Sequence, residues 1–257
     1  MLIDPTLDQM LEFCAGDPIE RVFLEDAARR GHSRFRAVQG ERGLDALCYF
    51  GANVVPSGRG CGAFAADAAS RMTRMIIGEE EAVGELWSAA RSVMPRPRED
   101  RPGQPVYVLD EAPPPGSSGL RAAQLEDLDI LVPACALTHE EELGVDPLRR
   151  DPIGFRRRTA AQIEEGRSWL WTEGETILFK AEASAWTPSA VQLQQVWVDP
   201  EARRMDHGTR GLSDLCRLLL EDTPSVCLFV RPENEPALRL YERVGMRRSG
   251  SYRSVLF

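Results

Sequence analysis

The sequence VQLQQVWVDPEARRMDHGTRGLSDLCRLLL, residues 191–220, predicts the fold of the surrounding chain. Its first part, residues 191–198, alternates apolar and polar residues and ends in β-branched and aromatic types, which is typical of a strand with one face on a core. Asp199 and Pro200 end this strand, and a basic loop follows. From Thr209 onward, apolar residues recur at helical spacing. They are Leu212, Leu215, Cys216 and Leu219.

A strand, a short loop and a helix in this order present backbone N–H groups and the positive end of a helix dipole to an anionic ligand. Three arginines lie in this loop or at the start of the expected helix. They are Arg203, Arg204 and Arg210. The stretch therefore predicts a site for an anion.

Residues 203–208, RRMDHG, resemble the R/Q-x-x-G-x-G/A loop with which the GNAT superfamily of acyl-CoA-dependent N-acyltransferases binds the pyrophosphate of coenzyme A. The first Arg and the last Gly match, whereas Asp206 stands where the family has its middle Gly. Glycine lets the backbone approach phosphates and adopt positive φ, and a carboxylate repels them. Asp tolerates left-handed conformations better than most residues. The backbone path can therefore survive while the affinity drops.

A second run also resembles the superfamily, through its N-x-x-A-x-x-x-Y-x-x-x-G-F motif. Asn234, Ala237, Tyr241 and Gly245 match, and Met246 replaces the usual Phe. The same residues predict a helix that begins after Asn234 as N-cap and ends before Gly245.

The elements expected from residue 120 to the last residue follow the order of the superfamily. We therefore expect an α/β chain, with an α+β mixed sheet, in which residues 113–257 form a complete GNAT acyltransferase domain. In residues 1–112 we expect fewer strands and helices in the same order, which would form a degenerate GNAT-like domain. This part resembles the uncharacterised domain that precedes the acyltransferase domain in two-domain actinobacterial-type GNAT proteins. The proline-rich run 111–119 marks the boundary.

Residues 57–62, SGRGCG, form a glycine-rich loop before an expected helix in the first half. One interpretation is a second acyl-CoA site. The other is a degenerate repeat that packs on the catalytic domain and shapes its substrate cleft, because glycine-rich loops also simply make turns.

The composition excludes several classes of function. The 257 residues carry a formal charge of −9, and no basic surface for nucleic acid is indicated. The six cysteines lie far apart without a CxxC pair, and the three histidines are too scattered for a metal set, so we expect reduced thiols and no metal. No apolar run approaches membrane-spanning length, and the start of the chain lacks a signal-peptide pattern. We expect a cytoplasmic monomer or homodimer without membrane contact.

The resemblance implies acetyl-CoA, or another acyl-CoA, as donor. In the family, the loop amides hold the pyrophosphate, the strand backbone pairs with the pantetheine arm, and a strand N–H polarises the thioester carbonyl. The cofactor-binding residues expected from it are Val196, Trp197, Val198, Arg203, Arg204, His207, Gly208, Thr209, Asn234, Ala237 and Tyr241.

The proton donor implied by the resemblance is Tyr241, because the matching Tyr can protonate the thiolate of coenzyme A. The alternative is a tyrosine that only packs beside the cofactor. Gln194 and Gln195 stand on the strand where some relatives carry a carboxylate, and an amide cannot accept the proton of the amine. Glu142, within an acidic run after the expected first helix of this domain, is the candidate base. A solvated charge run or a relaying water is the alternative.

Two hypotheses about function follow. The first is an N-acetyltransferase that moves the acetyl group of acetyl-CoA directly to a small-molecule or peptide amine. The second is a catalytically silent GNAT-fold module that binds a partner or senses a ligand, with Asp206 impairing its coenzyme A loop. A weaker third possibility is acyl transfer or decarboxylation on a carrier-protein thioester. The acceptor itself is left open, because fold does not fix function.

Overall fold

The computed structural model describes residues 1–32 and 34–257. The first half contains β1 (Leu2–Ile3), α1 (Leu7–Ala15), α2 (Val22–Arg29), β2 (Phe35–Gln39), β3 (Leu44–Phe50), β4 (Asn53–Gly58), the 3₁₀ helix η1 (Cys61–Phe64), α3 (Ala65–Ala69), β5 (Met75–Glu79), α4 (Glu80–Ala90) and β6 (Glu99–Leu109). The second half contains β7 (Arg121–Ala122), η2 (Leu125–Asp127), α5 (Leu128–Leu143), α6 (Pro147–Arg150), α7 (Pro152–Glu164), β8 (Ser168–Glu173), β9 (Thr176–Trp186), β10 (Val191–Trp197), η3 (Pro200–Ala202), α8 (His207–Leu219), β11 (Val226–Phe229), α9 (Glu235–Val244) and β12 (Arg247–Leu256).

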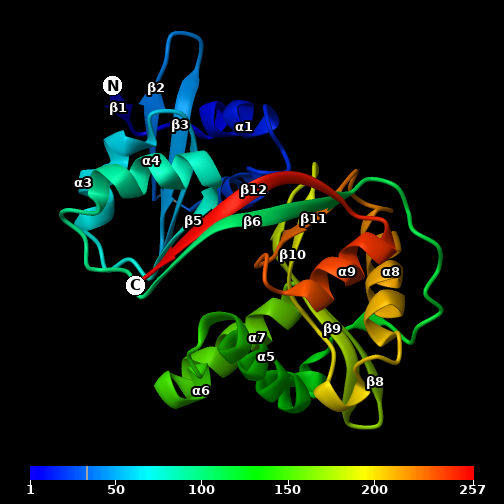
Figure 1. Cartoon of the computed structure of the whole chain (residues 1–257). Helices are drawn as coiled ribbons and strands as arrows, with labels where there is room; N and C mark the ends of the chain where they lie inside the picture. The colour runs from blue at the N-terminus through cyan, green and yellow to red at the C-terminus, as the bar shows by residue number, and fades with distance from the viewer. Residues whose placement is uncertain (33) are drawn as a thin grey trace.

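The strands of both halves form one mixed sheet. Within the described residues it has twelve strands in the order β1-β2-β3-β4-β5-β12-β6-β11-β10-β9-β8-β7. Most neighbours are antiparallel, and the pairs β4–β5 and β10–β11 are parallel. Helices cover both faces, as Figure 1 shows. The predicted α/β class with a mixed sheet is confirmed.

Two strands are exchanged between the halves. β6 belongs to the first half, yet it lies between β11 and β12. β12 is the last strand of the chain, yet it lies between β5 and β6, with Leu256 opposite Met75. Figure 1 shows these two long strands side by side, running from one half to the other. The domain boundary after residue 112 stays a prediction, and the regions on its two sides share backbone hydrogen bonds.

Helices α8 and α9 pack on one face of the second half's sheet. The predicted apolar face of α8 is fully buried there, with Leu212, Leu215, Cys216 and Leu219. Gly211 lies so close to the sheet that an added Cβ atom would come within 2.4 Å of the Phe179 ring. α9 begins after Asn234, whose side chain accepts a hydrogen bond from the N–H of Ala237 at 3.3 Å, and ends at Gly245 with φ of 97°. Both ends of α9 agree with the prediction.

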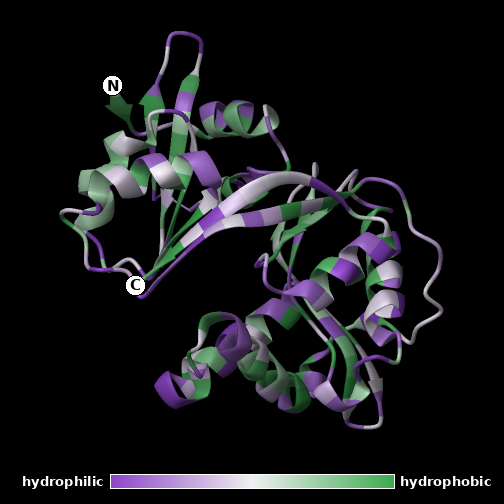
Figure 2. Ribbon diagram, in the orientation of Figure 1, coloured by the Kyte–Doolittle hydropathy of each residue, from purple (hydrophilic) through white to green (hydrophobic). Residues whose placement is uncertain are grey.

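Helices α5 and α7 cover the opposite face of the same strands. The consecutive residues Trp169 and Leu170 of β8 point into different cores, the first beneath α8 and α9 and the second beneath α5 and α7. In Figure 2 the hydrophobic colour lies on strands of both halves, whereas much of the long strand β12, α6 and the tip of the β2–β3 hairpin are pale or hydrophilic. The six cysteines are buried and free, as expected.

Several boundaries differ from the sequence prediction. α8 begins at His207, two residues before the expected Thr209, with Asp206 at the N-cap position but without a side-chain capping hydrogen bond. α5 continues to Leu143 and ends at Gly144 in the left-handed region, so residues 140–142 lie in its last turn and not after it. The prediction also missed α1, whose start is fixed by a capping box.

Candidate active site

A cleft of about 1260 Å³ lies between the two halves, where β10 and β11 diverge. These parallel strands are paired over only two residues of each, starting at Val191 and Val226. Beyond this point residues 193–196 and 228–230 line the cleft. The edge of β10 that faces β11 is therefore free of ladder hydrogen bonds to that strand. Such an edge offers N–H and C=O groups to a ligand with peptide-like amides.

A bulge in β10 lies at the same place. The pairing of β10 with β9 shifts register between Gln194 and Trp197, and Gln195 has φ of 54°. The Nζ of Lys180, a fully buried residue of β9, donates hydrogen bonds to the backbone oxygen of Gln195 at 3.2 Å and to its Oε1 at 3.0 Å. A β-bulge re-aims backbone groups, and a non-glycine residue with positive φ is held only by its surroundings. Lys180 supplies that support.

Five of the predicted site residues line this cleft together. They are Glu142, Val196, Asn234, Ala237 and Tyr241. The remaining predicted residues lie outside the cleft lining, at the end of β10 and around the start of α8. They are Trp197, Val198, Arg203, Arg204, His207, Gly208 and Thr209.

The N-terminus of α8 has free backbone donors. Asp206 adopts a left-handed conformation with φ of 63°, so it keeps the backbone path for which the family motif has Gly. Its side chain does not cap the helix. The Oδ1 of Asp206 instead lies 3.4 Å from Nη1 of Arg243 in α9, which offsets part of its negative charge. An uncapped helix N-terminus suits an anion.

The basic residues near this helix have different roles. Arg203 donates from Nε to the backbone oxygen of Val198 at 3.2 Å and pairs with Glu141 at 3.4 Å. Arg204 is exposed, with φ of 65°. The side chain of Arg210 instead donates hydrogen bonds to the backbone oxygens of Gly116 and Ser117 in the linker. Of the three arginines predicted here, Arg203 and Arg204 therefore remain beside the start of α8.

The side chains of two predicted residues pack against protein. Trp197 is buried in the core beneath α5, so only its backbone is available to a ligand. His207 lies edge-on to Trp171 at 4.9 Å between ring centroids. An added Cβ atom at Gly208 would lie in van der Waals contact with Leu240 at 3.4 Å.

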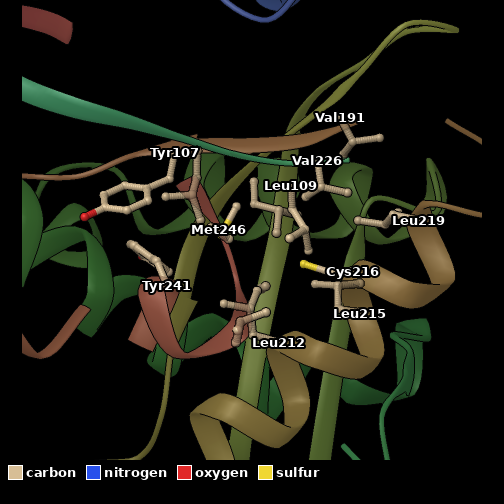
Figure 3. Packing of buried hydrophobic residues seen from close by; sticks show 14 of the residues in the cluster. Tyr107, Leu109, Val191, Leu212, Leu215, Cys216, Leu219, Val226, Tyr241 and Met246 are labelled. Atoms are coloured by element: carbon tan, nitrogen blue, oxygen red, sulfur yellow. The ribbon is translucent and has the colours of Figure 1, made fainter. Parts of the chain in front are cut away.

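Tyr241 is buried, and its ring packs against that of Tyr107 with 5.7 Å between the ring centroids (Figure 3). Burial raises its pKa, and the negative charge of Glu142 raises the pKa further. The hydroxyl therefore stays protonated at neutral pH, as a general acid requires.

Glu142 lies in the last turn of α5, where three arginines bind the backbone of the helix end. Arg98 donates to the oxygen of Leu143 at 2.8 Å. Arg101 donates to the oxygen of Glu142 at 2.9 Å, and Arg231 donates to that of the preceding residue, Glu141, at 3.1 Å. Cations suit the negative end of a helix dipole. The contacts fix the helix end over the cleft.

Glu142 is exposed to solvent within the cleft. Protein atoms nevertheless surround its carboxyl group and remove part of its hydration. Loss of hydration raises its pKa to about 7; the positive charge of Lys180 opposes the rise and the negative charge of Glu182 adds to it. A carboxyl group with this pKa is suited to accept a proton near neutral pH.

Sequence reasoning missed a second carboxylate in the cleft, that of Glu182 in β9. It is nearly buried and accepts hydrogen bonds from Sγ of Cys135 at 3.1 Å and from Nε2 of Gln194 at 3.2 Å. The amide of Gln194 thus orients a carboxylate. The sequence does carry a signal, because Lys180 is the only lysine of the chain and stands two residues before Glu182, with Ser184 two residues after it, in an otherwise apolar strand.

The glycine-rich loop of the first half binds the chain's own carboxylates. Glu85 accepts hydrogen bonds from the N–H groups of Gly60 at 2.7 Å and Cys61 at 2.8 Å. Glu79 accepts from the N–H of Gly58 at 3.2 Å and from the Ser57 hydroxyl. These contacts favour the interpretation of this half as a degenerate repeat, and its residues form one wall of the cleft.

Comparison with known proteins agrees with this geometry. Residues 136–246 match the model of the Acetyltransferase (GNAT) family, and residues 33–131 match a domain of unknown function, DUF4081. Residues 136–246 therefore match a GNAT acetyltransferase domain. No match is found among curated protein sequences.

Solved structures share the fold over nearly the whole chain. A putative GNAT-family acetyltransferase from Novosphingobium aromaticivorans aligns with a TM-score of 0.59 and 14% identity over 93% of this chain and 97% of its own. A GCN5-related N-acetyltransferase from Sphaerobacter thermophilus gives 0.60 and 16%, over 99% and 94%. A tandem GNAT protein from the clavulanic acid biosynthesis pathway gives 0.55 and 12%, over 97% and 93%. The tandem arrangement predicted from the sequence thus has a counterpart among known folds.

Within residues 1–32 and 34–257, no helix is long and apolar enough to cross a membrane. No group of three or more histidine, cysteine, aspartate or glutamate residues with metal-binding geometry occurs in the same ranges.

Proposed function

We propose that the chain is an acyl-CoA-dependent N-acyltransferase that uses acetyl-CoA and acts on an amine. The observation that carries this proposal is the free, bulged edge of β10, which lies in one cleft with Tyr241 and two carboxylates. The match to the GNAT family supports acyl transfer in general, and the donor, the acceptor and the residue roles are our proposal.

The described residues fit the donor at two points. The uncapped N–H groups at the start of α8 suit the pyrophosphate of coenzyme A, with Arg203 and Arg204 beside them. The free edge of β10 suits the amides of the pantetheine arm. When bound, acetyl-CoA supplies a thioester acyl group.

The chain's own residues would then serve the transfer. A backbone N–H of β10 beside Gln195 donates a hydrogen bond to the carbonyl oxygen as negative charge develops there. Glu142 or Glu182 accepts the proton that the amine loses when its nitrogen bonds to the carbonyl carbon, directly or through water. Tyr241 gives a proton to the sulfur as the carbon–sulfur bond breaks.

The second candidate function is a silent GNAT-fold module, which two observations favour. Asp206 places a carboxylate beside the helix N-terminus, and the Arg203 side chain is already engaged with Val198 and Glu141. Both reduce the positive potential offered to a phosphate.

Calorimetric titration with acetyl-CoA distinguishes the two functions. We expect the native protein to bind, and Asp206→Gly to bind about tenfold more tightly, because one nearby negative charge is removed. Asp199→Asn, before the loop, is the matched control and is expected to bind like the native protein. Binding by the glycine variant alone would establish the silent module. Binding by neither would refute donor recognition at this loop.

A further inference from the structure

The outer part of the cleft is rich in arginine, although the chain as a whole is acidic. Arg71 and Arg74 come from the segment between α3 and β5, Arg150 from the end of α6, and Arg158 from α7. All four are exposed and line the same cleft, two from the first half of the chain and two from the second. Their convergence there contrasts with the formal charge of −9 on the whole chain.

Most of this positive charge is unpaired. Within residues 1–32 and 34–257, the ion pairs include none for Arg71, Arg74 or Arg150, and only Arg158 has a partner, Asp151 at 3.3 Å. The other cleft arginines are occupied, because they bind the carbonyl groups at the end of α5. The Arg71 guanidinium lies over the Phe50 ring, 5.3 Å from its centroid, so those of Arg74 and Arg150 remain for a ligand. Arginine is the residue best suited to bind carboxylate or phosphate in a bidentate manner.

His139 lines the same cleft as these arginines and the proposed reacting groups. It lies half-buried on α5, three residues before Glu142 and four after Cys135, so all three share one face of the helix and line the cleft. Burial lowers the pKa of His139, and the charges of Arg158 and Arg74 lower it further. At about 1.5 Å of rise per residue, His139 is only about 4.5 Å along the helix axis from Glu142.

Arg74 and Arg150 thus line the same cleft as His139 and the proposed proton acceptors. We propose that the acceptor is a small amine that also carries an anionic group, a carboxylate or a phosphate, bound by Arg74 and Arg150 while its amine faces Glu142 and Glu182. This inference rests on the proposed function and names the substrate class of the same cleft.

Binding of product-like probes tests the inference without requiring turnover. The probes are N-acetylglycine and N-acetyl-O-phosphoethanolamine, each compared with an uncharged counterpart, N-acetylglycine amide and N-acetylethanolamine. We expect the native protein to bind at least one anionic probe about tenfold more tightly than its neutral counterpart, the scale of a charge-assisted pair. Tighter binding of N-acetylglycine than of its amide indicates that the site takes a carboxylate. Tighter binding of N-acetyl-O-phosphoethanolamine than of N-acetylethanolamine indicates that it takes a phosphate.

Two double variants locate the binding. Arg74→Gln/Arg150→Gln should lose the preference for the anionic probe and still bind acetyl-CoA like the native protein. Arg91→Gln/Arg149→Gln removes the same charge outside the cleft lining and should keep the preference. Thermal unfolding of each variant establishes that it is folded.

Several results would overturn the inference. They are equal binding of charged and neutral probes by the native protein, no binding of either probe, or an undiminished preference in the Arg74/Arg150 variant. Failure of the proposed function gives a different result. Acetyl-CoA would not bind to the native protein, while the charge preference of the probes would still be measurable.

Discussion

Tyr241 brings a protonated phenol to the lining of the cleft. Replacement by Phe removes one oxygen and leaves the ring contact with Tyr107. Because the departing sulfur would lose its proton donor, we expect kcat to fall about 10²–10⁴-fold, with little change in the KM for acetyl-CoA. Release of free thiol in steady-state assays measures both constants.

Tyr107→Phe is the matched control for this substitution. Its hydroxyl donates to Glu242 at 3.1 Å and lies outside the cleft lining, so kcat should be nearly unchanged. If Tyr241→Phe also kept its kcat, the residue would only pack beside the donor.

Glu142 makes the reaction dependent on pH in a defined direction. Its pKa is raised to about 7, and only the deprotonated carboxylate accepts a proton, so kcat/KM should rise as the pH rises through about 7. Glu142→Gln should remove this limb from the pH profile, and Glu140→Gln, on the same helix but outside the cleft lining, should keep it. An unchanged limb in Glu142→Gln would exclude Glu142 and leave Glu182 as the acceptor.

Residues with a fixed sequence spacing were predictable, and residues defined by strand pairing were not. Asn234, Ala237 and Tyr241 lie within one helix and its cap, so their local pattern sufficed. Glu182 acquires its role only because β9 pairs with β10, which brings Gln194 to its carboxylate. The polar residues 180, 182 and 184 mark β9 as unusual, but the local sequence does not show which strand pairs with it.

At the scale of the element, the bulge in β10 depends on one buried side chain. Lys180→Met keeps much of the length of Lys180 but removes both hydrogen bonds to Gln195. We expect the free energy of unfolding to fall by about 1–3 kcal/mol, as for other buried groups left without a partner. Binding of acetyl-CoA should also weaken, because the backbone groups of β10 are no longer held in place.

Urea denaturation and calorimetry measure these two effects. Ser184→Ala removes hydrogen bonds to Gln192, on the same two strands but at an earlier register shift and away from Gln195, and should weaken binding less. Equal losses of affinity in the two variants would argue against a special role for Lys180.

Element types were largely predictable because hydrophobic spacing reports local conformation. The strand and helix of residues 191–220 formed as expected, with the helix starting two residues earlier. The positions of β6 and β12 in the sheet were not predictable, because either strand can pair with several apolar edges. Their exchange depends on contacts between residues far apart in the chain.

At the scale of the whole molecule, this exchange should join the halves into one folding unit. β12 pairs with both β5 and β6, and β6 also pairs with β11, so neither half completes its sheet alone. We expect one calorimetric unfolding transition, with equal calorimetric and van't Hoff enthalpies. Two separated transitions would show that the halves unfold independently.

The cleft itself is a property of the whole molecule. Arg98 and Arg101 of the first half bind the end of α5. The strands β6 and β12 join the two halves of the chain, whose residues form the walls of the cleft. The first half thus contributes one wall of the cleft, and the acceptor site that we propose takes Arg74 from it.

Hydrogen–deuterium exchange with and without acetyl-CoA tests the central claim most directly, because it locates the donor on the chain. Binding should protect amides in residues 193–198, 203–209 and 234–241, where the free edge of β10, the start of α8 and α9 meet the donor. Protection should be absent at residues 57–62, where the chain's own carboxylates occupy the loop. Protection at that loop, or none along β10 and α8, would contradict the assignment of the active site.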